Sequence, residues 1–197
     1  MKVLTLISGG DTGGAKTHVL SLLRELSRIM DVQLVCFMKG AFSEEAAAMG
    51  IPTEVIEGNP LSALRKLRRL AEAFRCDIIH CHGARGNFMG MLLQKSVKAP
   101  LPTTVHSDYK LDYLGRPTGA AVYGTLNAIA LRHMDFLAGV SDSMSSLLIR
   151  RGFDPAKIFT IYNGITFDHA PQDFDRREWF RSLGLDIPED AVVAGIA

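Results

Sequence analysis

The chain has 197 residues, and its 22 Lys and Arg against 21 Asp and Glu give a formal net charge of +1. This balance provides no overall field that would collect nucleic acid, so we expect no nucleic-acid partner. Hydrophobic residues make up 47% and charged residues 22%, the composition of a globular domain with a proper core rather than a disordered chain. An odd number of cysteines, three, is no disulfide framework and favours a cytoplasmic location.

Short apolar runs of strand length alternate with amphipathic stretches of helix length. We predict strands at 2–7, 32–37, 53–56, 77–81, 103–106, 136–140 and 158–161. We predict helices at about 14–30, 42–49, 61–74, 86–96, 119–133 and 143–150. This alternation is typical of βαβ units. The predicted fold class is therefore α/β, a doubly wound, Rossmann-like, mostly parallel sheet of about seven strands with helices on both faces.

The rhythm of strands and helices stops near the carboxyl end of the chain. A polar, Pro-containing stretch at 167–175 is predicted to be a linker, and a short helix is predicted at 176–183. The apolar residues 191–197 are predicted to open another sheet that is cut off as it starts. We expect a Rossmann-like domain over 1–166 and, over 167–197, a linker with the truncated start of a second domain.

The loop after the first predicted strand is rich in glycine and leads directly into a helix. Its glycines are Gly9, Gly10, Gly13 and Gly14. Such a loop lets a phosphate approach the backbone N–H groups at a helix amino terminus. Ala15 precedes Lys16, which breaks the Walker pattern, and the loop holds no G-x-G-x-x-G, so we predict neither an ATPase nor a dinucleotide enzyme. A tight turn that needs glycine only for its geometry is the alternative.

Three histidines stand on or directly after predicted strands. His80 and His82 alternate with Cys81 and face one side of the fourth strand, but no third ligand lies nearby, so we predict no metal site. We interpret His82, at the strand end, as a ligand contact and His80 as structural. His106 ends the fifth strand, where its imidazole can donate to a sugar hydroxyl or phosphate or act as a base. A packing or capping role is the alternative for His106.

The third predicted helix is basic and amphipathic. The segment 61–75, from Leu61 to Arg75, holds five basic residues and one acidic residue, with leucines on one face. Two interpretations stay open: a solvated outer face of a helix packed on the sheet, or a peripheral contact with anionic lipid at the inner face of the membrane. No apolar stretch approaches the ~18 residues needed to cross a bilayer.

Five short motifs occur together in a familiar order. They are GGAKTHV at 13–19, DIIHCH at 77–82, TVH at 104–106, GVS at 139–141 and IYNGI at 161–165. With this set the chain resembles the amino-terminal domain of a family-4 retaining glycosyltransferase of the GT-B fold. The resemblance covers nearly the whole chain.

The resemblance implies a two-domain enzyme that moves a sugar from a nucleotide-sugar donor to an acceptor with retained configuration. This chain would be the acceptor-side half. The resemblance places His106 at the reaction centre, where it positions groups and stabilises charge more than it acts as a base. The other residues expected to bind the donor phosphate or the acceptor are Gly13, Gly14, Lys16, His82, Arg85, Ser141 and Asn163.

Two features of the sequence bear on the acceptor. Lys16 stands where the family often has an acidic or neutral residue, which favours an anionic acceptor. The segment 109–124, with Tyr109, Arg116 and two further tyrosines, is predicted to be an acceptor loop because aromatic rings stack on sugars and arginine pairs with anions. The acceptor itself, a sugar, a lipid or a small molecule, stays open.

The groups that grip the nucleotide belong to the family's second domain, so the resemblance implies that this polypeptide alone is inactive. No metal or other cofactor is expected. Two alternatives stay open: a stand-alone module that binds an anion or sugar phosphate, and a sugar-nucleotide epimerase of the GT-B type.

Overall fold

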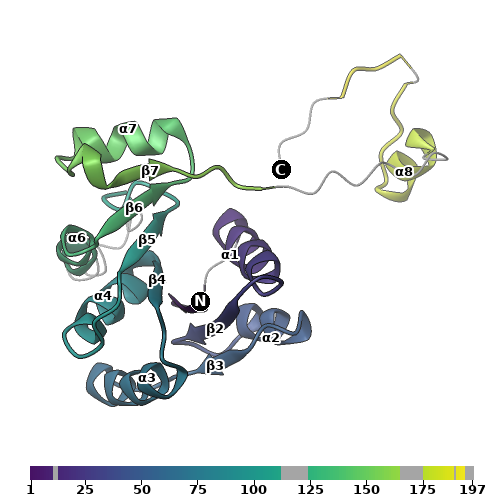
Figure 1. Cartoon of the computed structure of the whole chain (residues 1–197). Helices are drawn as coiled ribbons and strands as arrows, with labels where there is room; N and C mark the ends of the chain where they lie inside the picture. Colours follow the sequence, from purple (N-terminus) through teal and green to yellow (C-terminus); the bar gives the residue numbers. More distant parts are fainter. Residues whose placement is uncertain (11–12, 112–123, 165–174, 189, 194–197) are drawn as a thin grey trace. The chain divides into compact units, whose positions relative to one another are not determined.

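The computed structural model of the chain describes residues 1–10, 13–111, 124–164, 175–188 and 190–193 (Figure 1). The chain forms two compact units, Met1–Gly164 and Ile165–Ala197. All of the sheet and the residues of the site described below belong to the first unit, so the first unit is described first and by itself.

The first unit is built on a seven-stranded sheet in which every neighbouring pair is parallel. Its strands are β1 (Lys2–Ile7), β2 (Asp31–Cys36), β3 (Thr53–Val55), β4 (Ile78–His82), β5 (Pro102–Val105), β6 (Phe136–Gly139) and β7 (Ile158–Thr160). The spatial order is β3-β2-β1-β4-β5-β6-β7. The predicted doubly wound, Rossmann-like sheet is confirmed, and its switch point, where ligands bind in such folds, lies between β1 and β4.

Helices cover both faces of this sheet, as Figure 1 shows. They are α1 (Gly13–Leu26), α2 (Ala41–Ala48), α3 (Pro60–Phe74), α4 (Gly83–Gln94), α6 (Thr125–Arg132) and α7 (Asp142–Arg150), and a 3-10 turn, η2, spans Pro155–Lys157. One core cluster joins α1 and α2 to the sheet through residues such as Leu23 and Phe42. The other joins α3, α4, α6 and α7 through residues such as Leu67, Leu93 and Leu148.

The alternation of side chains along β4 decides which way its histidines face. Ile79 and Cys81 belong to the core on the α3 and α4 side. Since successive side chains of a strand point to opposite faces, His80 and His82 lie on the face covered by α1. The predicted common orientation of these two imidazoles is confirmed by their ring centroids, which are 4.3 Å apart.

Helix α4 approaches the sheet closely because two of its inner positions are glycine. A Cβ atom at Gly86 would lie 2.4 Å from the carbonyl oxygen of Leu6, and one at Gly90 would lie 2.4 Å from Sγ of Cys81. Gly83 has a φ of 67°, a left-handed conformation that favours glycine, and lets the helix begin directly after β4. The helix therefore begins at residue 83 and not, as predicted, at 86.

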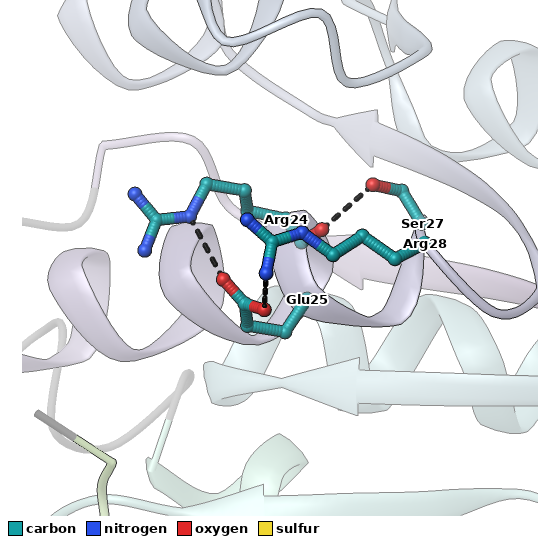
Figure 2. A network of polar contacts seen from close by, with 4 residues as sticks. All are labelled: Arg24, Glu25, Ser27 and Arg28. Atoms are coloured by element: carbon teal, nitrogen blue, oxygen red, sulfur yellow. Dashed lines mark hydrogen bonds and ion pairs between the residues drawn. The ribbon is translucent and has the colours of Figure 1, made fainter. Parts of the chain in front are cut away.

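Helix α1 ends at Leu26, four residues before the predicted end. Figure 2 shows its last turn, where Glu25 bridges Arg24 and Arg28 and the Ser27 hydroxyl donates to the Arg24 carbonyl oxygen at 2.7 Å. These ion pairs lie at the surface, where each contributes about 0 to 1 kcal/mol to the free energy of unfolding. They therefore have little influence on the fold.

Helix α3 begins after Asn59, whose side chain accepts a hydrogen bond from the Ser62 N–H at 2.9 Å. Leu67 is fully buried, whereas Leu61 is 77% exposed, so the leucine face predicted for this helix is only partly covered. The basic residues of the helix are exposed. No helix within the described ranges is long and apolar enough to span a membrane.

The second unit contains one described helix, α8 (Arg176–Ser182), capped by the side chain of Asp175. The short helix predicted here is confirmed. The predicted strand over 191–197 is wrong at residues 191–193, which form no strand, and its last four residues lie outside the described ones. Most of the predicted linker, residues 167–174, also lies outside them.

Candidate active site

Four histidines meet at the carboxyl edge of the sheet, next to the switch point. His82 is the last residue of β4, His106 directly follows β5, and His80 lies two residues back along β4. The fourth is His18, which lies in the second turn of α1. The ends of the neighbouring parallel strands β4 and β5 thus meet α1, which begins at the same edge of the sheet. This is why residues 18, 82 and 106 come together.

His82 and His106 contact each other directly. Nδ1 of His82 and Nε2 of His106 are 3.3 Å apart, and the two rings are stacked with centroids 5.6 Å apart. His18 approaches both, at 5.1 Å from His106 in an edge-to-face arrangement and at 6.2 Å from His82. Sequence reasoning found His82 and His106 but missed His18. Its only signal was its place in the GGAKTHV motif, one helical turn after Gly14.

Hydrogen bonds of two β5 threonines connect the strands and helices that carry the histidine pair. Nε2 of His80 and the Thr104 hydroxyl are 2.9 Å apart, so His80 is tied to the neighbouring strand, as its predicted structural role requires. On the opposite face the buried Thr103 hydroxyl donates to Oδ1 of Asn87 at 2.6 Å, and Nδ2 of Asn87 donates to Oδ1 of Asn127 at 2.8 Å. This series of hydrogen bonds connects β5, α4 and α6 on the face of the sheet opposite the histidines.

Asn163 reaches the cluster from the segment that follows β7. Its side chain hydrogen-bonds to the imidazole of His18. Burial lowers the pKa of His18, and this bond partly offsets the shift, as expected when the imidazole N–H is the donor. The structure therefore brings together three predicted residues, His82, His106 and, through His18, Asn163.

The cluster is uncharged at neutral pH. Burial, with a smaller effect of the neighbouring imidazoles, lowers the pKa of His80 and of His106 to about 4. The same causes hold the pKa of His82 well below its ordinary value. A second positive charge within 6 Å would be repelled by the first, so neutral rings are the state in which four imidazoles pack together.

Hydrogen bonding favours one tautomer of the His82 and His106 pair. His82 is 1% exposed, and no group among the described residues hydrogen-bonds to its Nε2. Orphaned buried N–H groups are rarer and costlier than orphaned acceptors, so Nε2 of His82 is better left without a proton. Nδ1 of His82 then donates to Nε2 of His106, and the His106 proton resides on Nδ1.

A cavity of about 320 Å³ opens beside this pair. It is lined by Ala15 of α1, by His82 and His106, and by residues at the beginning of α4 and on α6. His82, whose buried Nε2 has no hydrogen-bond partner among the described residues, is thus one of the residues that line the cavity.

The glycine pair lies at the amino end of α1. Gly13 has a φ of 63°, and Gly14 has ordinary helical backbone. A Cβ atom at either position would meet none of the described residues within 4 Å. Packing against the described residues therefore does not explain why residue 14 is glycine, although the left-handed backbone explains residue 13.

The remaining predicted residues are engaged in other contacts. Lys16 forms an ion pair with Glu45 of α2. Arg85 lies over the ring of Phe37, 5.4 Å from its centroid. The Ser141 hydroxyl accepts a hydrogen bond from the N–H of Met144 at 3.2 Å and so caps α7. None of these contacts joins the histidine cluster.

The loop that carries His106 is anchored to α7. Asp108 forms an ion pair with Arg151, and Tyr109 is 5% exposed with its ring edge-to-face on Phe153. Burial raises the pKa of Asp108, but the hydrogen bonds from Arg151 and Lys110 outweigh it and leave the pKa below its ordinary value. The prediction that Tyr109 contacts an acceptor is therefore wrong, because its ring is part of the core.

The other members of the predicted acceptor loop lie in residues 112–123, outside the described ones. In the described part of the chain no group of three or more His, Cys, Asp and Glu side chains is placed to hold a metal ion.

This architecture defines the class of protein. The domain is all-parallel and doubly wound, and its polar cluster and cavity lie next to the switch point. In Rossmann-like domains this is the place where small molecules bind. The model of the family Glycosyltransferase Family 4 matches residues 12–169. The match covers well over half of the chain, and the chain belongs to this family. No curated protein sequence matches.

Several solved structures share the fold of this chain and are longer than it. The Anabaena protein Alr3699/HepE in complex with UDP-glucose has 23% identity and a TM-score of 0.74 over 93% of this chain and 50% of its own. A glycosyltransferase from Rickettsia africae has 15% identity and a TM-score of 0.70, over 93% and 48%. A UDP-GlcNAc 2-epimerase from Methanocaldococcus jannaschii has 16% identity and a TM-score of 0.61, over 83% and 46%.

The chain spans about half the length of these solved structures. The resemblance inferred from the sequence motifs is confirmed, and the domain has the fold of the amino-terminal half of a GT-B glycosyltransferase.

Proposed function

We propose that this domain is the acceptor-side half of a glycosyltransferase that moves a sugar from a nucleotide-sugar donor to an acceptor with retention of configuration. The observation that carries the proposal is the His82 and His106 pair at the wall of a cavity in a Family 4 chain. The neighbour whose structure holds UDP-glucose supports a nucleotide-sugar donor. The residues 167–197 then lead into the donor-side half.

In this proposal His106 acts as a neutral hydrogen-bond donor. Its Nε2 accepts from His82 and its proton resides on Nδ1, so the ring offers an N–H to an oxygen of the bound ligand. The pKa of about 4 keeps the ring uncharged at neutral pH and makes it a poor base there. A fixed donor beside a cavity stabilises charge that develops on an oxygen. The acceptor proton then leaves with the departing phosphate.

The amino end of α1 is proposed to receive the phosphate of the donor or an anionic group of the acceptor. No described residue lies within 4 Å of a Cβ atom placed at Gly14, and the first N–H groups of a helix have no partner within the helix. Lys16 lies two residues further along α1, but its ammonium group is paired with Glu45. An anionic acceptor that uses Lys16 therefore has to displace the Glu45 carboxylate.

The exposed basic face of α3 supports a peripheral contact with anionic lipid. No metal or other cofactor is required by the proposal.

The test is an assay of nucleotide release and product stereochemistry with a panel of UDP, GDP and ADP sugars, on the native gene product and on the 197-residue chain. The proposal expects acceptor-dependent release by a protein that contains both halves, a product of retained configuration, and no release by the 197-residue chain. An epimerase is the alternative suggested by the M. jannaschii neighbour, and it would alter the donor sugar without any acceptor. Tight binding of a sugar phosphate with no turnover by any form would indicate a binding module.

A further inference from the structure

We propose that His18 is a positioning residue that holds the imidazole of His106 in the orientation in which it meets His82. The inference deepens the proposed function, and rests on it for the role of His106, but the coupling between the two rings is a property of the free protein. His18 is the one member of the histidine cluster that belongs to a helix, and its contacts lie at the end of β4, directly after β5 and after β7.

The bond between His82 and His106 does not by itself fix the His106 ring. Its 3.3 Å length lies beyond the usual range of 2.7 to 3.2 Å for a nitrogen donor. The terminal torsion of histidine is broad, so the plane of the His106 ring can rotate away from His82 at little cost in local energy. A second contact has to hold the plane of the ring.

His18 provides that contact. Its ring meets the ring of His106 at a centroid distance of 5.1 Å and an angle of 69°, the edge-to-face arrangement that aromatic rings prefer. No other ring within the described ranges contacts His106 in this way, since the contact with His82 is a stacked one. The edge-to-face contact depends on the angle between the two ring planes, so it holds His106 in the plane in which its Nε2 meets Nδ1 of His82.

The His18 ring is itself held from two sides. Its backbone belongs to α1, whose neighbouring residue Val19 is fully buried against the sheet. Its imidazole hydrogen-bonds to the side chain of Asn163, beyond β7. Asn163, which the sequence motifs marked as lining the cleft, thus acts through His18 in this arrangement.

The test is nuclear magnetic resonance of the imidazole nitrogens in the 197-residue chain, which reports the nitrogen of His106 that carries the proton. In the wild type we expect a single tautomer with the proton on Nδ1. His18→Ala should give a mixture of both tautomers of His106. His18→Phe keeps an edge-to-face ring and should retain most of the single-tautomer pattern. Asn163→Ala leaves both rings in place and should give a partial loss.

His133→Ala is the matched control, because His133 is exposed and bonds only locally, to the carbonyl oxygen of Ile129. It should leave the His106 signals unchanged, and an equal change there would overturn the inference by showing that the effect is unspecific. Unchanged His106 signals in His18→Ala would also overturn it. If His18→Ala does not fold, Asn163→Ala decides, and an unaltered tautomer pattern in that variant overturns the inference. None of these readouts requires sugar transfer, so failure of the proposed function leaves them interpretable.

Discussion

At the scale of single residues the central feature is a set of imidazoles kept without charge. His82 lines the cavity and has a buried Nε2 without a partner among the described residues, and hydrogen bonding favours the tautomer of His106 that carries its proton on Nδ1. A neutral donor of this kind is pre-organised, so it stabilises developing charge without a change in its own protonation. Two predictions belong to this scale.

The first concerns His106 in a protein that contains both halves. His106→Ala removes the donor and should lower kcat on the order of 10²- to 10³-fold, as loss of one oxyanion-type donor does. His106 is only half-buried, so the free energy of unfolding should change far less than this loss in rate would suggest. Steady-state kinetics and urea unfolding measure the two effects, and unchanged turnover would show the histidine to be structural.

The second concerns pH. The folded-state pKa of His80 and of His106 is about 4, below the ordinary value of 6.5, so the folded protein binds fewer protons than the unfolded chain between these pH values. The stability is therefore complete above about pH 6.5 and should fall as the pH decreases toward 4. For each group, the loss in the free energy of unfolding is at most roughly 1.4 kcal/mol for each pH unit between its folded and unfolded pKa values.

Urea unfolding at several pH values measures this slope. His80→Asn should reduce it, whereas His133→Asn, at an exposed position, should not. A slope that is the same in the wild type and in His80→Asn would contradict the account.

Residues of the site were predictable where they end a strand. His82 and His106 follow strands whose apolar runs are plain in the sequence, so the edge of the sheet places them. His18 was missed because a histidine inside a helix looks like any polar helical residue, and its contacts come from segments far away in the chain. Tyr109 was misassigned for the same reason, since Phe153, on which it packs, lies 44 positions later.

At the scale of elements two features position the site, the close approach of α4 to β1 and the anchoring of the loop after β5. Both rest on contacts between residues distant in sequence. Each gives one prediction.

Gly86→Ala should destabilise the domain. The new Cβ atom would lie 2.4 Å from a backbone oxygen of β1, so the helix has to move, at a cost of about 1 to 3 kcal/mol. Gly14→Ala is the matched control, because the Cβ atom there is unobstructed and alanine favours a helix. Urea unfolding of the two variants compares them, and equal stabilities would show that the close approach is not required.

Asp108→Asn should loosen the loop that begins at His106. The variant removes a carboxylate from Arg151, whose Nε is buried with no partner in the described part of the chain, and should cost about 1 to 3 kcal/mol. Glu45→Gln at the more exposed Lys16 pair is the control and should cost less than about 1 kcal/mol. Hydrogen exchange of the loop amides reports the loosening, and unaltered protection in Asp108→Asn would contradict it.

The elements themselves were largely predictable. The strand at 2–7 has the predicted bounds, and the other strands differ by one residue at one or both ends, because buried parallel strands are short apolar runs. The start of α4 was placed three residues late, since only the left-handed backbone of Gly83 allows a helix directly after a strand. Of the strand expected at 191–197, the described residues 191–193 form no strand.

At the scale of the whole molecule, the function proposed above makes the domain one half of a two-part enzyme. The solved structures that it resembles are about twice its length, and the cavity beside His106 lies at the edge where ligands of such folds bind. The donor is therefore expected to be held jointly with the other half.

The most direct measurement is nucleotide release from the sugar-nucleotide panel by the native gene product, by its His106→Ala variant and by the 197-residue chain. The account predicts acceptor-dependent release by the native protein, a severe loss in the variant and none from the 197-residue chain. Sustained release by the 197-residue chain alone, or an active His106→Ala protein, would contradict it.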